Sequence, residues 1–234
     1  LQHYQQLGIL LGNACDNVRF LRFPEHLTLG ENQIKHIRSV NERFQHIVFE
    51  DPIPTNLVRG DILENLTLCP SLTIEKCNFV DNRARGILIT TPGKVFITKT
   101  TFSNPGSAIR ISGDVIDWFE SGATNSIEVV GNVLQNCNYG SSVWGNATID
   151  VYPAFDMPDG HHYHQSVVIR DNQFKTSHDR LLEAKNVGRI EFVNNLILRS
   201  VSHAIHESKG DYCVLDNVGE SIVRGNAERL TGNS

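Results

Sequence analysis

The stretch IEFVNNLI, residues 190–197, shows a pattern that recurs along most of the chain. Apolar residues alternate with others, an asparagine or small polar residue follows, and an apolar residue closes the unit. Four further copies are LTIEKCNF (72–79), VFITKTTF (95–102), IEVVGNVL (127–134) and VVIRDNQF (167–174), with a partial copy, SIVRGN, at 221–226. Their closing apolar residues are spaced by 23, 32, 40 and 23 residues. A 23-residue unit that lengthens by insertion predicts stacked coils with loops of unequal length.

The alternation within each copy predicts β-strands, because every second residue of a strand lies on the same face. A column of asparagines falls where each strand is expected to bend: Asn132, Asn172, Asn195 and Asn226. Asparagine tolerates a left-handed bend and can hydrogen-bond to the asparagine of the next coil. Residues 67–234 are therefore predicted to form a parallel β-helix, in which stacking of the coils builds one continuous core.

A second apolar strand follows in each coil, and aligning these strands predicts which side chains face outward. The inward column is Ile87, Ile109, Ile149, Leu182 and Ile205. The outward column is then Leu88, Arg110, Asp150, Glu183 and His206. Two interpretations of this polar column remain open. It is either a solvated face with cross-strand ion pairs, or the floor of a ligand site, because the longest loops flank it.

Residues 1–66 lack the repeat. They contain four short strand candidates, NVRFLRF, QIKHIRSV, QHIVFE and DILENLTL, separated by TLGEN, VNER and DPIPTN. Short strands with frequent turns predict a small antiparallel, barrel-like β module ahead of the β-helix.

The composition excludes several classes of function. A net charge of -5 and a pI near 6.1 argue against a nucleic-acid-binding protein, which needs a basic face. No apolar run approaches the roughly 18 residues of a membrane span.

The five cysteines form no CxxC pair and predict buried, reduced thiols. The HHYH cluster, residues 161–164, is interpreted as a solvated loop rather than a metal site, so neither metal nor cofactor is expected.

Four short motifs are more specific than the strand pattern: DNRARG (81–86), TPGKV (91–95), GSAI (106–109) and WFESG (118–122). With them the chain resembles the α-1,3-galactosidases of glycoside hydrolase family 110, over roughly residues 16–200. The resemblance implies a right-handed parallel β-helix interrupted by a small β-barrel. It also implies a secreted or periplasmic bacterial hydrolase whose partner is a glycan with terminal galactose. An oligomer is compatible with the sequence.

The resemblance further implies exo-acting hydrolysis with inversion, which needs two carboxyl groups roughly 6.5–9.5 Å apart. In that family these acids are associated with an adjacent Asp pair and another Asp on an earlier coil. The present sequence contains no Asp-Asp dipeptide. We therefore expect a C-terminal portion whose main catalytic acids lie upstream. Asp150 and Glu183 are weaker catalytic candidates, because carboxyl groups on adjacent coils can share a proton.

The expected role of the chain is then to bind the sugar. The candidate substrate-binding residues are Arg83, Arg85, Arg110, Asp117, Trp118 and Glu120. An indole packs well against the apolar face of galactose, and the charged groups can hydrogen-bond to hydroxyls. The alternatives are loop or core packing for the indole, solvated loop positions for the acids and structural ion pairs for the arginines. A non-catalytic carbohydrate-binding β-helix is the second function hypothesis, and a polysaccharide lyase is a weaker third.

Overall fold

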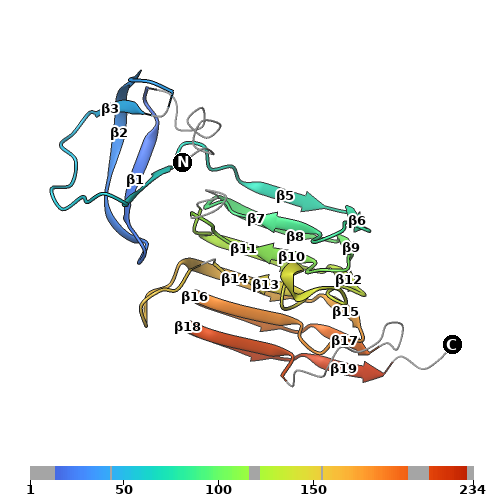
Figure 1. The fold of residues 1–234 in the computed structure, drawn as a ribbon. Helices are drawn as coiled ribbons and strands as arrows, with labels where there is room; N and C mark the ends of the chain where they lie inside the picture. Colours follow the sequence, from blue (N-terminus) through green and yellow to red (C-terminus); the bar gives the residue numbers. More distant parts are fainter. Residues whose placement is uncertain (1–13, 43, 116–121, 154, 200–210, 231–234) are drawn as a thin grey trace. The chain divides into compact units, whose positions relative to one another are not determined.

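The computed structural model describes residues 14–42, 44–115, 122–153, 155–199 and 211–230, and these residues form an all-β fold (Figure 1). The chain divides into two compact units. The first contains the described residues of 1–69 together with those of 114–122, and the second contains those of 70–113 and 123–234.

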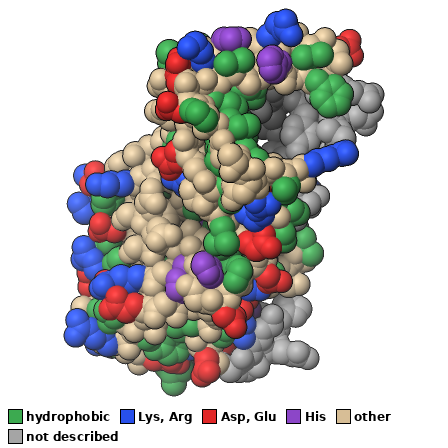
Figure 2. Space-filling view, turned by 90° about the vertical axis from the view of Figure 1, so that its left-hand side faces the viewer, with side chains coloured by type: hydrophobic (Ala, Val, Ile, Leu, Met, Phe, Trp, Pro, Cys, Tyr) green, Lys and Arg blue, Asp and Glu red, His purple; other side chains and the backbone are tan. Residues whose placement is uncertain are grey.

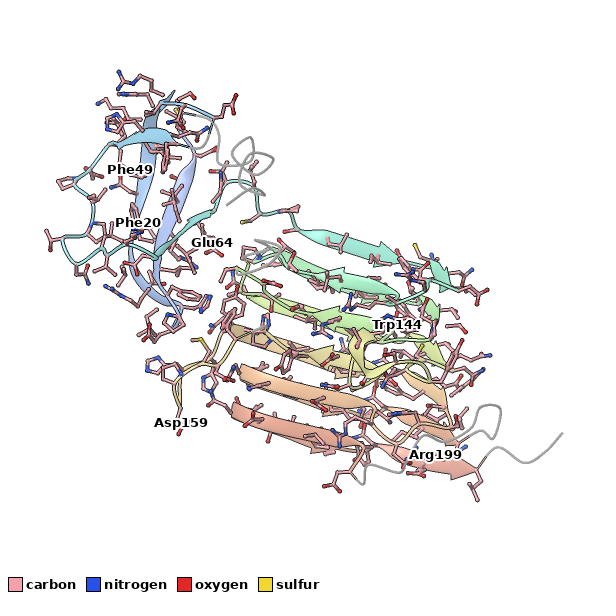
Figure 3. The ribbon with its side chains drawn as sticks, in the orientation of Figure 1. Phe20, Phe49, Glu64, Trp144, Asp159 and Arg199 are labelled. Atoms are coloured by element: carbon pink, nitrogen blue, oxygen red, sulfur yellow. The ribbon has the colours of Figure 1, made fainter. Side chains whose placement is uncertain are left out.

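The first unit is a four-stranded antiparallel sheet with strand order β3-β2-β1-β4. Its strands are β1 (Asn17–Arg22), β2 (Leu27–Ser39), β3 (Gln45–Phe49) and β4 (Ile62–Asn65). The rings of Phe20 and Phe49 meet edge to face with centroids 5.2 Å apart in its small core (Figure 3). The expected break at TLGEN is wrong, because β2 runs through this segment. Thr28 pairs with Leu21 and Gly30 with Phe20, so one extra residue is absorbed as a bulge.

The second unit is the predicted parallel β-helix, with three strands in each complete coil (Figure 1). Its strands are β5 (Leu72–Glu75), β6 (Asn78–Val80), β7 (Ile87–Ile89), β8 (Lys94–Thr98), β9 (Thr101–Ser103), β10 (Ile109–Ile111), β11 (Ser126–Val130), β12 (Val133–Gln135), β13 (Ile149–Val151), β14 (His164–Arg170), β15 (Gln173–Thr176), β16 (Leu182–Val193), β17 (Leu196–Arg199), β18 (Cys213–Arg224) and β19 (Ala227–Leu230). One six-stranded sheet has the order β19-β17-β15-β12-β9-β6. The other two faces join into one sheet, because β16 pairs with both β13 and β14.

The coils stack in the register that the repeat predicts. On the first face, Ile127 pairs with Val95 and with Val167. On the second face, Phe102 pairs with Phe79 and with Leu134. The largest buried side chains include Phe102, Phe174 and Phe192, which place the core inside the stack. The 23-residue repeat therefore reports one turn of the β-helix.

The asparagine column forms a hydrogen-bonded ladder, here called the asparagine ladder. The amide of Asn132 donates to Asn172 Oδ1, that of Asn172 to Asn195 Oδ1, and that of Asn195 to Asn226 Oδ1, over 3.0–3.1 Å. The backbone N–H of each donor residue reaches the same oxygen. The ladder confirms the predicted coil-to-coil bonds.

The expected left-handed conformation of these asparagines is wrong. At each step of the ladder, the positive φ belongs to the residue before the asparagine: Gly131, Asp171, Asn194 and Gly225, with φ of 66°, 57°, 55° and 68°. The bend is thus made one residue earlier, and it leaves the asparagine side chain free to point inward and bond along the stack.

Two side-chain predictions also need correction. The five cysteines are free, as expected, but only Cys137 is buried, while Cys15 and Cys77 are exposed. His164 is not part of a solvated loop. It begins strand β14 and its side chain is fully buried.

The described part of the chain holds no helix with the length and apolarity required to cross a bilayer. Acidic and basic side chains are intermixed over the face seen in Figure 2 rather than separated by sign.

Candidate functional site

The structure brings Arg110, Asp150 and Glu183 together on one outward face of the β-helix, and we call these three residues the polar stripe. Arg110 pairs in register with Asp150, and Asp150 with Glu183, from strands β10, β13 and β16. Neighbouring strands lie about 4.8 Å apart, so the three side chains are direct neighbours. The fifth member of the predicted column is wrong. Val214 on β18 pairs with Glu183, and His206 lies outside the described residues.

Asp150 is the buried centre of the stripe. Its side chain is 0% exposed, and its Oδ2 atom lies 3.2 Å from Arg110 Nη1 and accepts from the backbone N–H of Asn146 at 3.3 Å. Burial raises the pKa of the Asp150 carboxyl, the Arg110 charge and the Asn146 N–H counter this, and Glu183 adds to the rise. Its Oδ1 atom is buried and has no hydrogen-bond partner among the residues that the structure describes.

The segment 141–148, here called the strap, covers Asp150. It contains the short 3-10 helix η1 (Ser142–Trp144) and joins β12 to β13. Ser107 anchors it twice, since Ser107 Oγ donates to Ala147 O at 2.6 Å and Ser107 N to Trp144 O at 3.2 Å. Gly145 has φ of 129°, and a Cβ atom there would collide with Ser107 Oγ. The strap therefore lies against the stripe because a glycine permits the close approach.

Asn146 links the strap to both acids of the stripe. Its side-chain amide donates to Glu183 Oε1 at 3.1 Å, while its backbone N–H binds Asp150. The other oxygen of Glu183 accepts from Arg180 Nη1 at 2.6 Å. Asn146 thus connects the Arg110–Asp150 ion pair to the Arg180–Glu183 ion pair of the next coil through hydrogen bonds. The Arg110, Arg180 and Glu183 side chains each remain 16–19% exposed, so a ligand can reach their edges.

Arg85 and Arg83 occupy different environments, although both were predicted to bind the substrate. Arg85 is half-buried, donates to Val143 O of the strap at 3.5 Å, and its charge opposes the raised pKa of Asp150. Arg83 is exposed. The structure therefore joins Arg85 to the stripe and not Arg83.

Tyr152, just after β13, extends the polar face beside the stripe. The Arg110 guanidinium carbon lies 5.7 Å from the centre of its ring, and Lys185 Nζ lies 5.6 Å from the same centre. Lys185 also pairs with Asp156 at 2.5 Å and with Asp216 at 3.9 Å. These cations have carboxylate partners, so the face presents balanced charge rather than a basic patch.

Three predicted substrate residues, Asp117, Trp118 and Glu120, lie outside the described residues. The half-buried tryptophan of the described site is Trp144 on the strap (Figure 3). Sequence reasoning missed Asn146, Arg180, Trp144 and Tyr152 as members of the site. Tyr152 follows Asp150 by two residues, a spacing that keeps side chains on one face of extended backbone, and this was a usable signal. The others meet the stripe only through the folding of loops.

The HHYH segment leads into strand β14. Among the described ranges no group of three or more His, Cys, Asp or Glu side chains is placed to hold a metal ion. His164 Nδ1 instead lies 3.0 Å from Thr124 Oγ1 and 3.3 Å from Thr124 N. Desolvation by burial lowers the pKa of His164 to about 3. This histidine is a buried, neutral residue of the scaffold.

What the site can do follows from these contacts. It offers exposed edges of arginine and glutamate, each held in place by a partner, on a rigid sheet. Such groups suit the hydroxyls of a neutral sugar, which both donate and accept hydrogen bonds.

Known proteins resemble the chain over most of its length. Residues 1–63 match the family described as GLAA-B beta-barrel domain II. The chain is 30% identical over 227 residues to alpha-1,3-galactosidase A of Shewanella woodyi and 33% identical over 226 residues to alpha-1,3-galactosidase A of Bacteroides fragilis. It is 32% identical over 199 residues to alpha-1,3-galactosidase B of Akkermansia muciniphila. The matches cover 97%, 95% and 84% of the chain but 37%, 37% and 25% of these relatives. Over most of its length, the chain is therefore a homologue of part of the alpha-1,3-galactosidases A and B.

Proposed function

We propose that this chain is the sugar-binding part of an exo-acting, inverting α-1,3-galactosidase that removes terminal galactose from glycans outside the cytoplasm. The observation that carries the proposal is the homology to alpha-1,3-galactosidases over 97% of the chain. The chain spans about 37% of that relative, and we propose that the main catalytic acids belong to the remainder of such a polypeptide.

The site supports a neutral sugar as the ligand. Arg110 pairs with Asp150, Arg180 with Glu183, and Lys185 with Asp156, so each of these cations already has a carboxylate partner. A polysaccharide lyase would instead need a basic group free to take a proton beside an acidic sugar. The charge balance therefore favours galactose over a uronic acid or a sulfated sugar.

Asp150 and Glu183 are better placed to hold the site than to drive hydrolysis. Asp150 has no exposed side-chain surface, and both oxygens of Glu183 already accept hydrogen bonds. A general acid or base must reach the leaving oxygen or the attacking water. We assign Asp150 to orientation of Arg110, and Glu183 to contact with sugar hydroxyls rather than to catalysis.

The test is galactose release by the natural gene product that contains this chain, with α-1,3-linked galactobiose as substrate and the anomer followed by proton NMR. We expect free galactose that appears first as the β-anomer, which reports inversion. A protein that binds the disaccharide but releases no galactose would be a non-catalytic carbohydrate-binding β-helix, the second candidate. The absence of an Asp-Asp pair from this chain is compatible with that candidate as well as with catalytic acids in the remainder of the polypeptide. Absence of binding would overturn both.

A further inference from the structure

We propose that Asn146 is a positioning residue for the sugar-binding face, and that it holds the Glu183 carboxylate in the orientation that accepts sugar hydroxyls. The inference rests on the proposed function and deepens it. Asn146 lies on the strap and contacts the two acids on adjacent coils through different atoms, its backbone N–H and its side-chain amide.

The first argument is electrostatic. Asp150 and Glu183 are paired in register, so two carboxylates face each other at the spacing of neighbouring strands. Like charges directly opposite each other on a sheet are destabilising. The side-chain N–H of Asn146 lies 3.1 Å from Glu183 Oε1, and a donor at this position offsets the repulsion without adding a charge. Without it, Glu183 is expected to turn away from Asp150.

The second argument is geometric. Arg180 fixes Glu183 Oε2 and Asn146 fixes Oε1, so the plane of the carboxylate is set by two bonds, one to each oxygen. A carboxylate oxygen has two lone pairs, and each bound oxygen therefore keeps one site for a hydroxyl. Removal of one bond leaves the group able to rotate about the Arg180 contact. The loss is one of orientation, since both charges remain.

The third argument is the rigidity of the strap. Ser107 binds Trp144 and Ala147 on either side of Asn146, and Gly145 packs where no Cβ fits. Asn146 is thus carried by a short segment that is fixed to the β10 coil. A residue on such a support can impose an orientation on Glu183, whereas a residue on a freely moving loop would follow it.

The experiment compares Asn146→Asp, Asn146→Ala and the native protein, as the full natural gene product, in hydrolysis of α-1,3-galactobiose between pH 5 and pH 8. Asn146→Asp has nearly the same shape but cannot donate when ionised. We expect its KM to rise roughly tenfold or more at pH 8, with kcat within about threefold, because a hydrogen bond to a charged group is lost. Two neighbouring carboxylates raise the pKa of the introduced acid, so lowering the pH from 8 to 5 increases its protonated fraction, which can donate again.

Recovery of KM at pH 5 is the decisive readout, because a purely structural defect would not be rescued in the same way. Asn146→Ala should show a raised KM at both values of pH. Asn78→Asp, on an exposed strand position of β6, is the matched control and should behave as the native protein.

An Asn146→Asp protein with native KM at pH 8, or with an equally raised KM at pH 5 and pH 8, would overturn the inference alone. A native protein that neither binds nor cleaves the disaccharide would overturn the proposed function and this inference with it. The two failures are distinguished by the native protein.

Discussion

The asparagine ladder and the polar stripe are both columns of polar side chains carried by the same coils, and they differ in how their hydrogen bonds are completed. In the ladder, each step repeats the same amide contact, and the buried asparagines bond to each other and to backbone carbonyls. In the stripe, no two neighbours are alike, and one oxygen of Asp150 has no partner in the described structure. Repetition thus marks a column that stabilises the stack.

The irregular column is the better candidate for function. A fully satisfied buried network contributes to stability, whereas a group left incomplete costs stability and calls for another explanation. Substitutions in the ladder should therefore reduce the free energy of unfolding most, and substitutions in the stripe should affect galactoside binding most.

The largest expected effect is at the centre of the ladder. Asn172→Ala leaves the backbone and side-chain N–H groups of Asn132 without their acceptor and removes the donor to Val129 O. Buried groups without a partner cost about 1–3 kcal/mol each, so we expect the free energy of unfolding to fall by about 4 kcal/mol. Urea unfolding followed by circular dichroism measures it.

The matched control for the ladder is Asn78→Ala, an exposed asparagine on β6, which should change the stability by less than about 0.5 kcal/mol. Equal, small effects at both sites would show that the ladder is not a source of stability and would remove the contrast with the stripe.

A smaller effect on stability is expected in the stripe. Asp150→Ala removes the partner of Arg110, which keeps some access to water, so we expect a loss of about 2–3 kcal/mol rather than the larger cost of a fully buried charge. Binding of α-1,3-galactobiose should weaken at the same time, and calorimetry measures both. Asp216→Ala, at a largely exposed carboxylate near Lys185, is the control and should be near neutral in stability. Unchanged sugar binding in Asp150→Ala would separate the stripe from the proposed function.

The same contrast explains how much of the molecule could be predicted from its sequence. The pairing of Ile127 with Val95 and Val167, and the asparagine ladder, were predictable because the repeat states them once in each coil. The stripe was predictable through Glu183 for the same reason. The prediction of His206 as the next member of the column was wrong, because Val214 pairs with Glu183. Apolar and polar residues alternate both in AIHES (204–208) and in the segment that starts at Cys213, and alternation alone cannot choose between two candidate strands.

The rest of the site depends on tertiary contacts that no local pattern encodes. Asn146 and Glu183 are 37 residues apart, and the strap brings them together only once the coils have stacked. His164 was assigned to a loop because the HHYH cluster follows the turn-like sequence MPDG (157–160). Its burial next to Thr124 depends on a residue 40 positions earlier.

His164 is a further buried polar group, and its contribution to the stability of the fold should depend on pH. The pKa of His164 is lowered from 6.5 to about 3 by desolvation, so the folded protein holds it neutral while the unfolded chain takes up a proton below pH 6.5. Stability is then full above pH 6.5 and falls as the pH drops toward 3, by about 1.4 kcal/mol at pH 5.5 relative to pH 7.5. Unfolding free energies at these two values of pH measure the difference in the native protein and in His164→Gln.

In His164→Gln, the unfolding free energy lost between pH 7.5 and pH 5.5 should be smaller by about 1.4 kcal/mol. This holds even if the variant is less stable at both values of pH. His36→Gln, at an exposed position of β2, should keep the native dependence. An unchanged dependence in His164→Gln would mean that the buried ring is not the group that responds to acid.

The smallest expected effects separate the two arginines of the DNRARG motif. Arg85 contacts the strap and acts on Asp150, whereas Arg83 is exposed. Arg83→Ala should therefore change stability by less than about 0.5 kcal/mol and leave galactoside binding unchanged. Arg85→Ala should cost about 1 kcal/mol through loss of a charged hydrogen bond and should weaken binding, as calorimetry with α-1,3-galactobiose would show. If Arg83→Ala weakened binding as much as Arg85→Ala, the sugar-binding face would have to extend from the stripe to the exposed start of this motif, and contact with the strap would no longer mark its members.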